Sequence, residues 1–157
     1  MQKVESRTSL EKALDEHKEL RTLLGELLSF LDEPRPELQS ADAGHWASSL
    51  TEQLLNLHNK VSHHFREEEA SGVLEDLEEN YPRASRSIGA LRTDHDRILA
   101  DFRAVLPAAM CYAEGRSGES QNLRRWTRSI VEHIQRHEAE ETELMQKLIL
   151  EELGTGD

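Results

Sequence analysis

Apolar residues recur along most of this chain at intervals of three and four residues, which is the spacing of one face of an α-helix. Prolines and glycines interrupt the pattern in three places, around Pro34, Pro82 and Gly115. The interruptions leave four periodic segments, at about 8–32, 43–78, 83–113 and 119–152. Nothing alternates with the period of two that a half-buried strand would show. The pattern predicts four helices, the third of which Pro107 should kink or end early.

Short connections between long helices favour antiparallel neighbours. We therefore predict an all-α fold, an antiparallel up-down-up-down four-helix bundle, built as a single domain over residues 1–157. The first and third segments share one apolar pattern when His17 is aligned with His95. The second and fourth match when His64 is aligned with His137, and a glutamate then follows four residues later in both. The chain has the pattern of two similar helical hairpins.

A helical wheel places His64 and Glu68, one turn apart, on the apolar stripe of the second segment. That stripe consists of Leu50, Leu54, Leu57 and Val61. His63 and Glu67 fall roughly 110° or more from its centre, so we expect them to face water. The run from 67 to 80 is strongly acidic, and we expect it to be a solvated face.

The fourth segment repeats this arrangement with His137 and Glu141. The apolar residues on its stripe are Trp126, Ile130, Ile134, Leu144 and Leu148. Glu138 lies well off the stripe and should face water. His133 is about 40° from His137 on the inner face, which leaves open whether it is a ligand or a neighbour of one.

His17 and His95 each lie within the apolar stripe of their own segment, whereas His45, His58 and His63 have the positions of surface residues. Four histidines and two glutamates therefore face inward. Burying an unpaired carboxylate costs several kcal/mol, and no lysine or arginine falls on the same stripes. Imidazoles facing carboxylates suit a divalent transition metal.

The donor set narrows the choice of metal. Six groups exceed the needs of one tetrahedral zinc ion, and no inward thiolate is present for an iron–sulfur cluster. Two iron ions bridged by both glutamates would use all six groups. Each iron would keep two imidazoles and positions for a bridging oxygen and an external ligand.

Charge and cysteine content limit the partners and the location. The formal net charge is −12, which disfavours nucleic acid and anionic membranes as partners. No apolar run approaches the length of a membrane span. The single cysteine, Cys111, fits a reducing cytoplasm, which is the location we expect.

Four segments together resemble a known family: "LDEHKEL", "HHFREEE", "RTDHDRIL" and "HEAEETELMQ". Their succession is similar to the hemerythrin-like HHE cation-binding domain. The resemblance implies a four-helix bundle around a non-haem di-iron centre, with Glu68 and Glu141 bridging two iron ions. The ligand set that it implies is His17, His64, Glu68, His95, His137 and Glu141.

The sequence departs from the oxygen-carrying hemerythrins in two places. Those proteins have a second histidine one turn after the first on the third helix, where Leu99 stands here. They also end in HxxxxD, but Thr142 lies five residues beyond His137. The match is closer to non-carrier members. It implies a protein that binds or reacts with O2, NO or peroxide, with an electron donor as a further partner. Sensing, stress protection and iron handling are the roles implied.

Two other functions compete with this interpretation. A ferritin-like di-iron oxidase needs Glu-x-x-His on two helices, and no Glu-x-x-His occurs in the sequence. A metal-free helical interaction or phosphotransfer module remains the alternative. A phosphotransfer bundle needs one exposed histidine, whereas this pattern hides several.

Overall fold

The computed structural model describes residues 2–33, 41–116 and 120–154, and all regular secondary structure in these ranges is helical. The long helices are α1 (Gln2–Asp32), α2 (Ala41–Ala70), α4 (Ser85–Ala113) and α5 (Ser120–Gly154). Helix α3 (Val73–Asn80) and the 3₁₀ turn η1 (Pro82–Ala84) are short and lie between α2 and α4. The predicted all-α class is confirmed.

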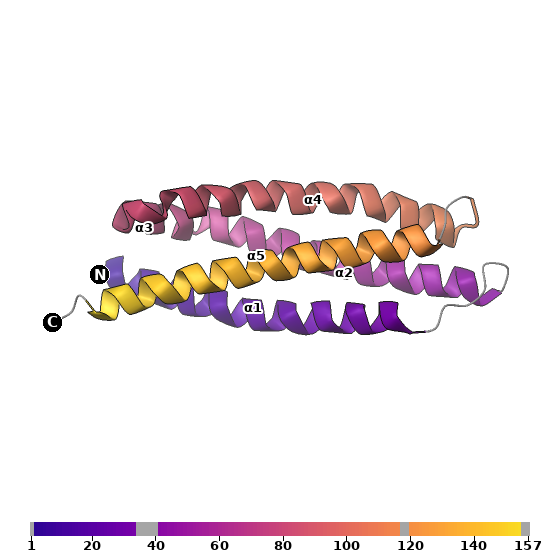
Figure 1. Ribbon diagram of the computed structural model, residues 1–157, viewed down its shortest axis with the longest axis horizontal. Helices are drawn as coiled ribbons and strands as arrows, with labels where there is room; N and C mark the ends of the chain where they lie inside the picture. Colours follow the sequence, from indigo (N-terminus) through magenta and orange to yellow (C-terminus); the bar gives the residue numbers. More distant parts are fainter. Residues whose placement is uncertain (1, 34–40, 117–119, 155–157) are drawn as a thin grey trace.

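The four long helices lie side by side, and each one runs opposite to the long helix before it in the chain (Figure 1). Helix α1 packs against α2 and α5, and α4 packs against the same two helices. Each long helix therefore contacts two others around a shared axis. Side chains from all four helices can meet on that axis.

The predicted segment 43–78 is two helices rather than one. Helix α2 ends at Ala70, and α3 begins at Val73 after Gly72, whose φ of 73° lies in the left-handed region. The acidic run is also only partly a solvated face, because Val73, Leu74 and Leu77 of α3 are buried. These three side chains cover one end of the bundle.

Pro107 does not end the third predicted helix early, since α4 continues to Ala113. A proline inside a helix removes the hydrogen bond to the carbonyl four residues earlier, here that of Arg103. Both residues are exposed, so water can satisfy that carbonyl.

The apolar core consists of two clusters. The larger contains Leu20, Val61, Phe65, Ile98 and Ile134 together with residues nearer the α1–α2 and α4–α5 connections. The smaller contains Ala13, Val73, Leu74, Leu77, Ala84, Ile88, Met145 and Leu148. Helices α1, α4 and α5 each carry buried polar residues between their contributions to the two clusters, and α2 carries His64 and Glu68 near the end of its contribution to the larger one. Apolar packing therefore closes off a polar zone from both ends.

The two tryptophans differ in burial. Trp46 is buried and stacks on Phe30, with ring centroids 6.1 Å apart. Trp126 is 48% exposed, so its placement on the inner stripe was wrong. It lies eleven residues, about three turns, before His137.

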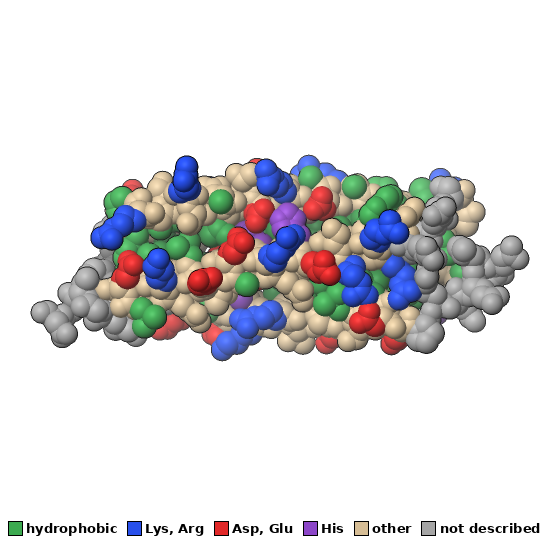
Figure 2. Space-filling model, viewed as in Figure 1, with side chains coloured by type: hydrophobic (Ala, Val, Ile, Leu, Met, Phe, Trp, Pro, Cys, Tyr) green, Lys and Arg blue, Asp and Glu red, His purple; other side chains and the backbone are tan. Residues whose placement is uncertain are grey.

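Basic and acidic side chains are interspersed over the face shown in Figure 2, with apolar side chains between them. Within the described ranges, no helix is both long enough and apolar enough to cross a membrane.

The backbone at Gly72 gives a test of the α2–α3 break. Gly72→Ala should lower the free energy of unfolding by about 1–2 kcal/mol, because a Cβ is disfavoured at positive φ. Gly25→Ala, in the exposed face of α1, should raise it by about 0.5–1 kcal/mol, because alanine favours helix. Denaturant unfolding measures both. Equal effects of the two substitutions would contradict the assigned backbone at Gly72.

Candidate metal centre

The structure brings all six predicted site residues together in the polar zone. None of these residues is more than 5% exposed. They come from all four long helices: His17 from α1, His64 and Glu68 from α2, His95 from α4, and His137 and Glu141 from α5. Helical spacing explains the two pairs, since residues four apart lie on one helix face.

Glu68 lies between two groups of histidines. Its Oε1 is 2.6 Å from His64 Nε2 and 3.6 Å from His17 Nε2. Its Oε2 is 3.3 Å from His95 Nε2. The two oxygens of one carboxylate therefore face different histidines.

The two oxygens of Glu141 also face different histidines. Its Oε1 is 3.2 Å from His17 Nε2, and its Oε2 is 3.1 Å from His137 Nε2. Both carboxylates therefore direct Oε1 towards the His17 side of the cluster and Oε2 away from it. The geometry divides the site into two positions, one beside His17 and His64 and one beside the other two histidines.

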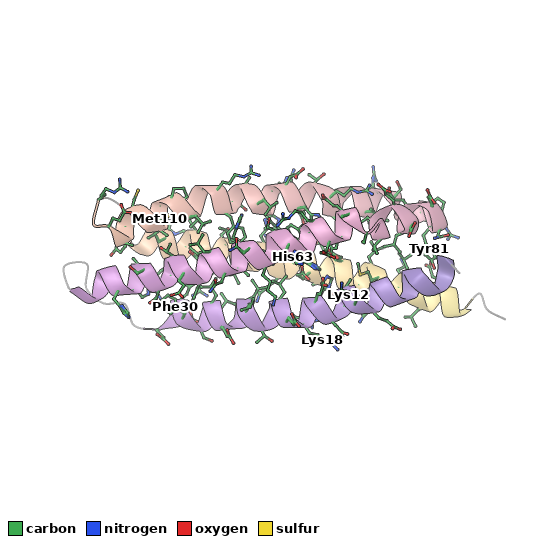
Figure 3. The ribbon with its side chains drawn as sticks, turned by 180° about the vertical axis from the view of Figure 1, so that it is seen from behind. Lys12, Lys18, Phe30, His63, Tyr81 and Met110 are labelled. Carbon is green, nitrogen blue, oxygen red and sulfur yellow. The ribbon has the colours of Figure 1, made fainter. Side chains whose placement is uncertain are left out.

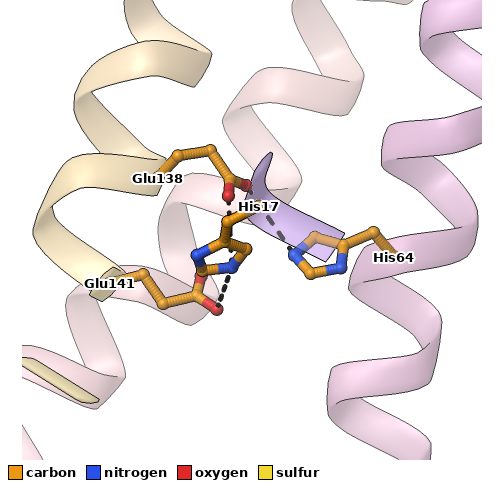
Figure 4. A group of neighbouring side chains, drawn as sticks. All are labelled: His17, His64, Glu138 and Glu141. Atoms are coloured by element: carbon orange, nitrogen blue, oxygen red, sulfur yellow. Dashed lines mark hydrogen bonds and ion pairs between the residues drawn. The ribbon is translucent and has the colours of Figure 1, made fainter. Parts of the chain in front are cut away.

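Glu138 also belongs to this cluster, contrary to the sequence prediction. It is 2% exposed, its Oε2 is 3.1 Å from His17 Nε2, and its Oε1 is 3.7 Å from His64 Nε2 (Figure 4). Helix α5 packs against both α1 and α4, so its buried face is wider than its apolar stripe. A residue about 100° from His137 still points inward, towards α1. By contrast, His63, which is labelled in Figure 3, is exposed as predicted. Glu67 is also exposed, as predicted.

The outer nitrogens of the histidines are held by neighbouring helices. His17 Nδ1 lies 2.8 Å from Thr142 Oγ1 of α5. His64 Nδ1 lies 2.8 Å from a carboxylate oxygen of Glu16 on α1. Each contact orients an imidazole and leaves its Nε2 directed to the centre.

The histidines of the second hairpin are held in the same way. His95 Nδ1 lies 3.2 Å from Glu69 Oε1 of α2, and His137 Nδ1 lies 3.4 Å from Asp94 Oδ2 of α4. Asp94 Oδ1 also lies 3.0 Å from His133 Nε2. His133 is therefore placed behind His137, in contact with the aspartate that supports it. None of the four supporting residues was identified from the sequence.

The inner atoms are left without hydrogen bonds. Nε2 of His64, His95 and His137, both oxygens of Glu68 and Glu138, and Oε2 of Glu141 have no hydrogen-bond partner among the described residues. Several of them nevertheless lie within ion-pair distance of each other. Buried polar atoms without partners are costly, so their convergence fits a bound cation.

Two groups of these side chains have ligand atoms close enough for one ion each. The atoms of the first group, His17, His64, Glu138 and Glu141, lie within 4.8 Å of one another. The ligand atoms of the second group, His95, His137 and Glu141, also lie within 4.8 Å of one another. Nitrogen and carboxylate donors in this ratio suit iron and other first-row metals.

Protons occupy the cluster when metal does not. Burial alone would lower the pKa of His17, but Glu141, Glu68 and Glu138 outweigh it and raise that pKa to about 10. Burial likewise opposes protonation of His64, whose pKa Glu68 and Glu138 raise to about 9. Both imidazoles are protonated at neutral pH in the metal-free protein.

The carboxylates of the cluster differ from each other. Burial would raise the pKa of Glu68, but its close contacts with Glu141 and the surrounding histidines hold that pKa well below the usual range. Burial raises the pKa of Glu138 to about 7, with Glu141 adding to the effect and His17 opposing it. Glu68 is therefore anionic at neutral pH, whereas Glu138 is close to half protonated.

Comparison with known proteins agrees with the geometry. A family model described as the hemerythrin HHE cation-binding domain matches residues 8–151, nearly the whole chain. Comparisons with curated proteins and with solved structures gave no match.

Metal binding should release protons. At pH 7.5 a divalent metal must displace the protons on His17 and His64, so affinity should rise as the pH approaches 9. Titration calorimetry of the metal-free protein with Co²⁺, in two buffers of different ionisation enthalpy, gives the number of protons released. Binding without proton release would contradict the protonated state described here.

Proposed function

The chain belongs to the hemerythrin HHE cation-binding domain family, and from this we propose that it is a non-haem di-iron protein. In this proposal the chain is a single domain that forms an antiparallel up-down-up-down four-helix bundle. The six ligands predicted from the sequence are His17, His64, Glu68, His95, His137 and Glu141. The protein would bind or react with O2, NO or peroxide.

The observation that carries the proposal is the arrangement of the two carboxylates. Oε1 of Glu68 and of Glu141 faces the position between His17 and His64, and Oε2 of each faces the other position. A carboxylate with its oxygens directed to two positions can bridge two ions. Two such carboxylates and two imidazoles at each position provide the ligands for a pair.

The bound iron pair would supply the electrons and the open position that O2, NO or peroxide requires. The chain supplies the surroundings. The outer contacts from Glu16, Glu69, Asp94 and Thr142 keep each imidazole oriented and strengthen it as a ligand. The apolar clusters on either side keep bulk water out.

The access available at the site favours a small reactant. A surface pocket of about 90 Å³ lies beside Glu68 and is lined by Lys12, Ala13, Glu16, Glu67, Glu68, Ser71 and Val73. A larger cavity of about 260 Å³, between Tyr81 and Glu151, shares no residue with the cluster. The volume beside Glu68 suits a diatomic molecule or peroxide better than an organic substrate.

The contacts at Leu99 favour a non-carrier role. Leu99 packs against the larger apolar cluster, so α4 adds no second imidazole to His95. The alternative of a metal-free phosphotransfer module has less support. Its reactive histidine must be accessible, and the exposed His45 and His63 lie outside the buried cluster. Sensing, stress protection and iron handling all remain compatible with the proposed centre.

Protein purified in air should contain about two irons per chain and show oxo-bridge charge-transfer absorption. Reduction followed by NO or O2 should change the spectrum, because an external ligand enters the open position. Elemental analysis with optical spectra before and after each gas measures both. Folded protein without any transition metal would disprove the proposal.

Glu68→Ala and Glu141→Ala should each reduce the iron content by at least about half, because each removes a bridge. Glu67→Ala is the matched control, since Glu67 adjoins Glu68 in sequence but is exposed. Iron per chain by elemental analysis, with circular dichroism to check folding, distinguishes them. Equal loss from Glu67→Ala would contradict the assignment of the bridges.

A further inference from the structure

The two hairpins place different side chains at one equivalent position. When His64 is aligned with His137, the next residues, Phe65 and Glu138, fall on each other. Both are 2% exposed and both reach the cluster. One is an apolar ring and the other a carboxylate, so the otherwise similar halves of the site differ here.

Glu138 contacts the position between His17 and His64. Its two oxygens lie 3.1 Å from His17 Nε2 and 3.7 Å from His64 Nε2. Neither oxygen has a hydrogen-bond partner among the described residues. A buried carboxylate that lacks these bonds and faces two imidazole nitrogens is placed as a ligand would be.

Phe65 covers the other position. Its ring stacks on His95, with centroids 3.9 Å apart and planes at 12°. It also meets the edge of His137, with centroids 5.3 Å apart. The ring has no donor atom, so this half of the site keeps two imidazoles and the two shared carboxylates.

We propose that Glu138 is a third carboxylate ligand at the His17–His64 position, which makes the two iron positions chemically unequal. The inference rests on the proposed di-iron function and extends it. Five protein side chains would hold the iron at the His17–His64 position: His17, His64, Glu68, Glu138 and Glu141. Two imidazoles and the two shared carboxylates would hold the iron at the His95–His137 position, beside the Phe65 ring, and NO or another external ligand would bind there.

The unequal ligand sets have a charge consequence. The His17–His64 position holds one more carboxylate, which favours the ferric state of that iron. The apolar ring beside the other iron excludes water and leaves its position free for a small neutral ligand. This division requires no movement of the helices.

Mössbauer spectroscopy of protein loaded with ⁵⁷Fe tests the assignment without an activity measurement. The wild-type protein should show two doublets of equal area, one for each iron. Glu138→Gln removes the charge at nearly constant volume and should shift one doublet or remove it, with iron falling to about one per chain. Glu140→Gln, an exposed residue on the same helix, is the matched control and should leave both doublets unchanged.

NO added to the reduced wild-type protein should perturb the doublet that Glu138→Gln leaves intact. If Glu138→Gln does not fold by circular dichroism, Glu138→Asp replaces it, since a shorter carboxylate should still shift one doublet. Two irons with unchanged doublets in the folded variant would overturn the proposal, as would loss of both irons. Wild-type protein without iron would instead disprove the di-iron function itself.

Discussion

Four imidazoles and three carboxylates lie in the middle of an apolar bundle, and the cost of removing them from water constrains everything around them. Each imidazole has two ring nitrogens, and each buried nitrogen needs a polar partner or a metal ion. The outer nitrogens are satisfied by residues of neighbouring helices, and the inner nitrogens converge with the carboxylates. The outer contacts fix how the helices sit relative to one another, because each joins two adjacent helices. The same contacts therefore support both the packing of the helices and the geometry of the site.

The two hairpins use one scheme for this support. Glu16 directly precedes His17 in α1, and its carboxylate contacts Nδ1 of His64 in α2. Asp94 directly precedes His95 in α4, and its carboxylate contacts Nδ1 of His137 in α5. Glu69 directly follows Glu68 in α2 and contacts Nδ1 of His95. Thr142 directly follows Glu141 in α5 and contacts Nδ1 of His17. In each of these pairs of neighbouring residues, one side chain faces the centre of the site, and the other contacts a histidine on an adjacent helix. Aligning the hairpins by their histidines recovers all four contacts, so the sequence repeat reflects a repeat in packing.

The sequence identified the six central groups because helical periodicity alone decides which face of a helix is inward. It misplaced Glu138, since the apolar stripe marks only part of a face that contacts two neighbouring helices. It predicted a helix through residue 78 but missed the break at Gly72, and it missed the burial of Val73, Leu74 and Leu77 because these residues stand within an acidic run. The supporting contacts depend on the register between helices, which periodicity does not give. A signal for them was present, however, in the polar residues directly beside His17, Glu68, His95 and Glu141.

The repeated frame would by itself give the two positions of the site equal surroundings. The residue after the second-helix histidine of each hairpin is well suited to create the difference. This residue is buried and adjoins a histidine of the cluster. Its side chain contacts the histidine on the first helix of the other hairpin: Glu138 contacts His17, and Phe65 contacts His95. A carboxylate there would add a ligand for a bound metal, whereas a phenyl ring would exclude water and add none. Because the backbone of the two hairpins can stay alike, one pair of side chains is enough to assign different chemistry to the two halves of the site.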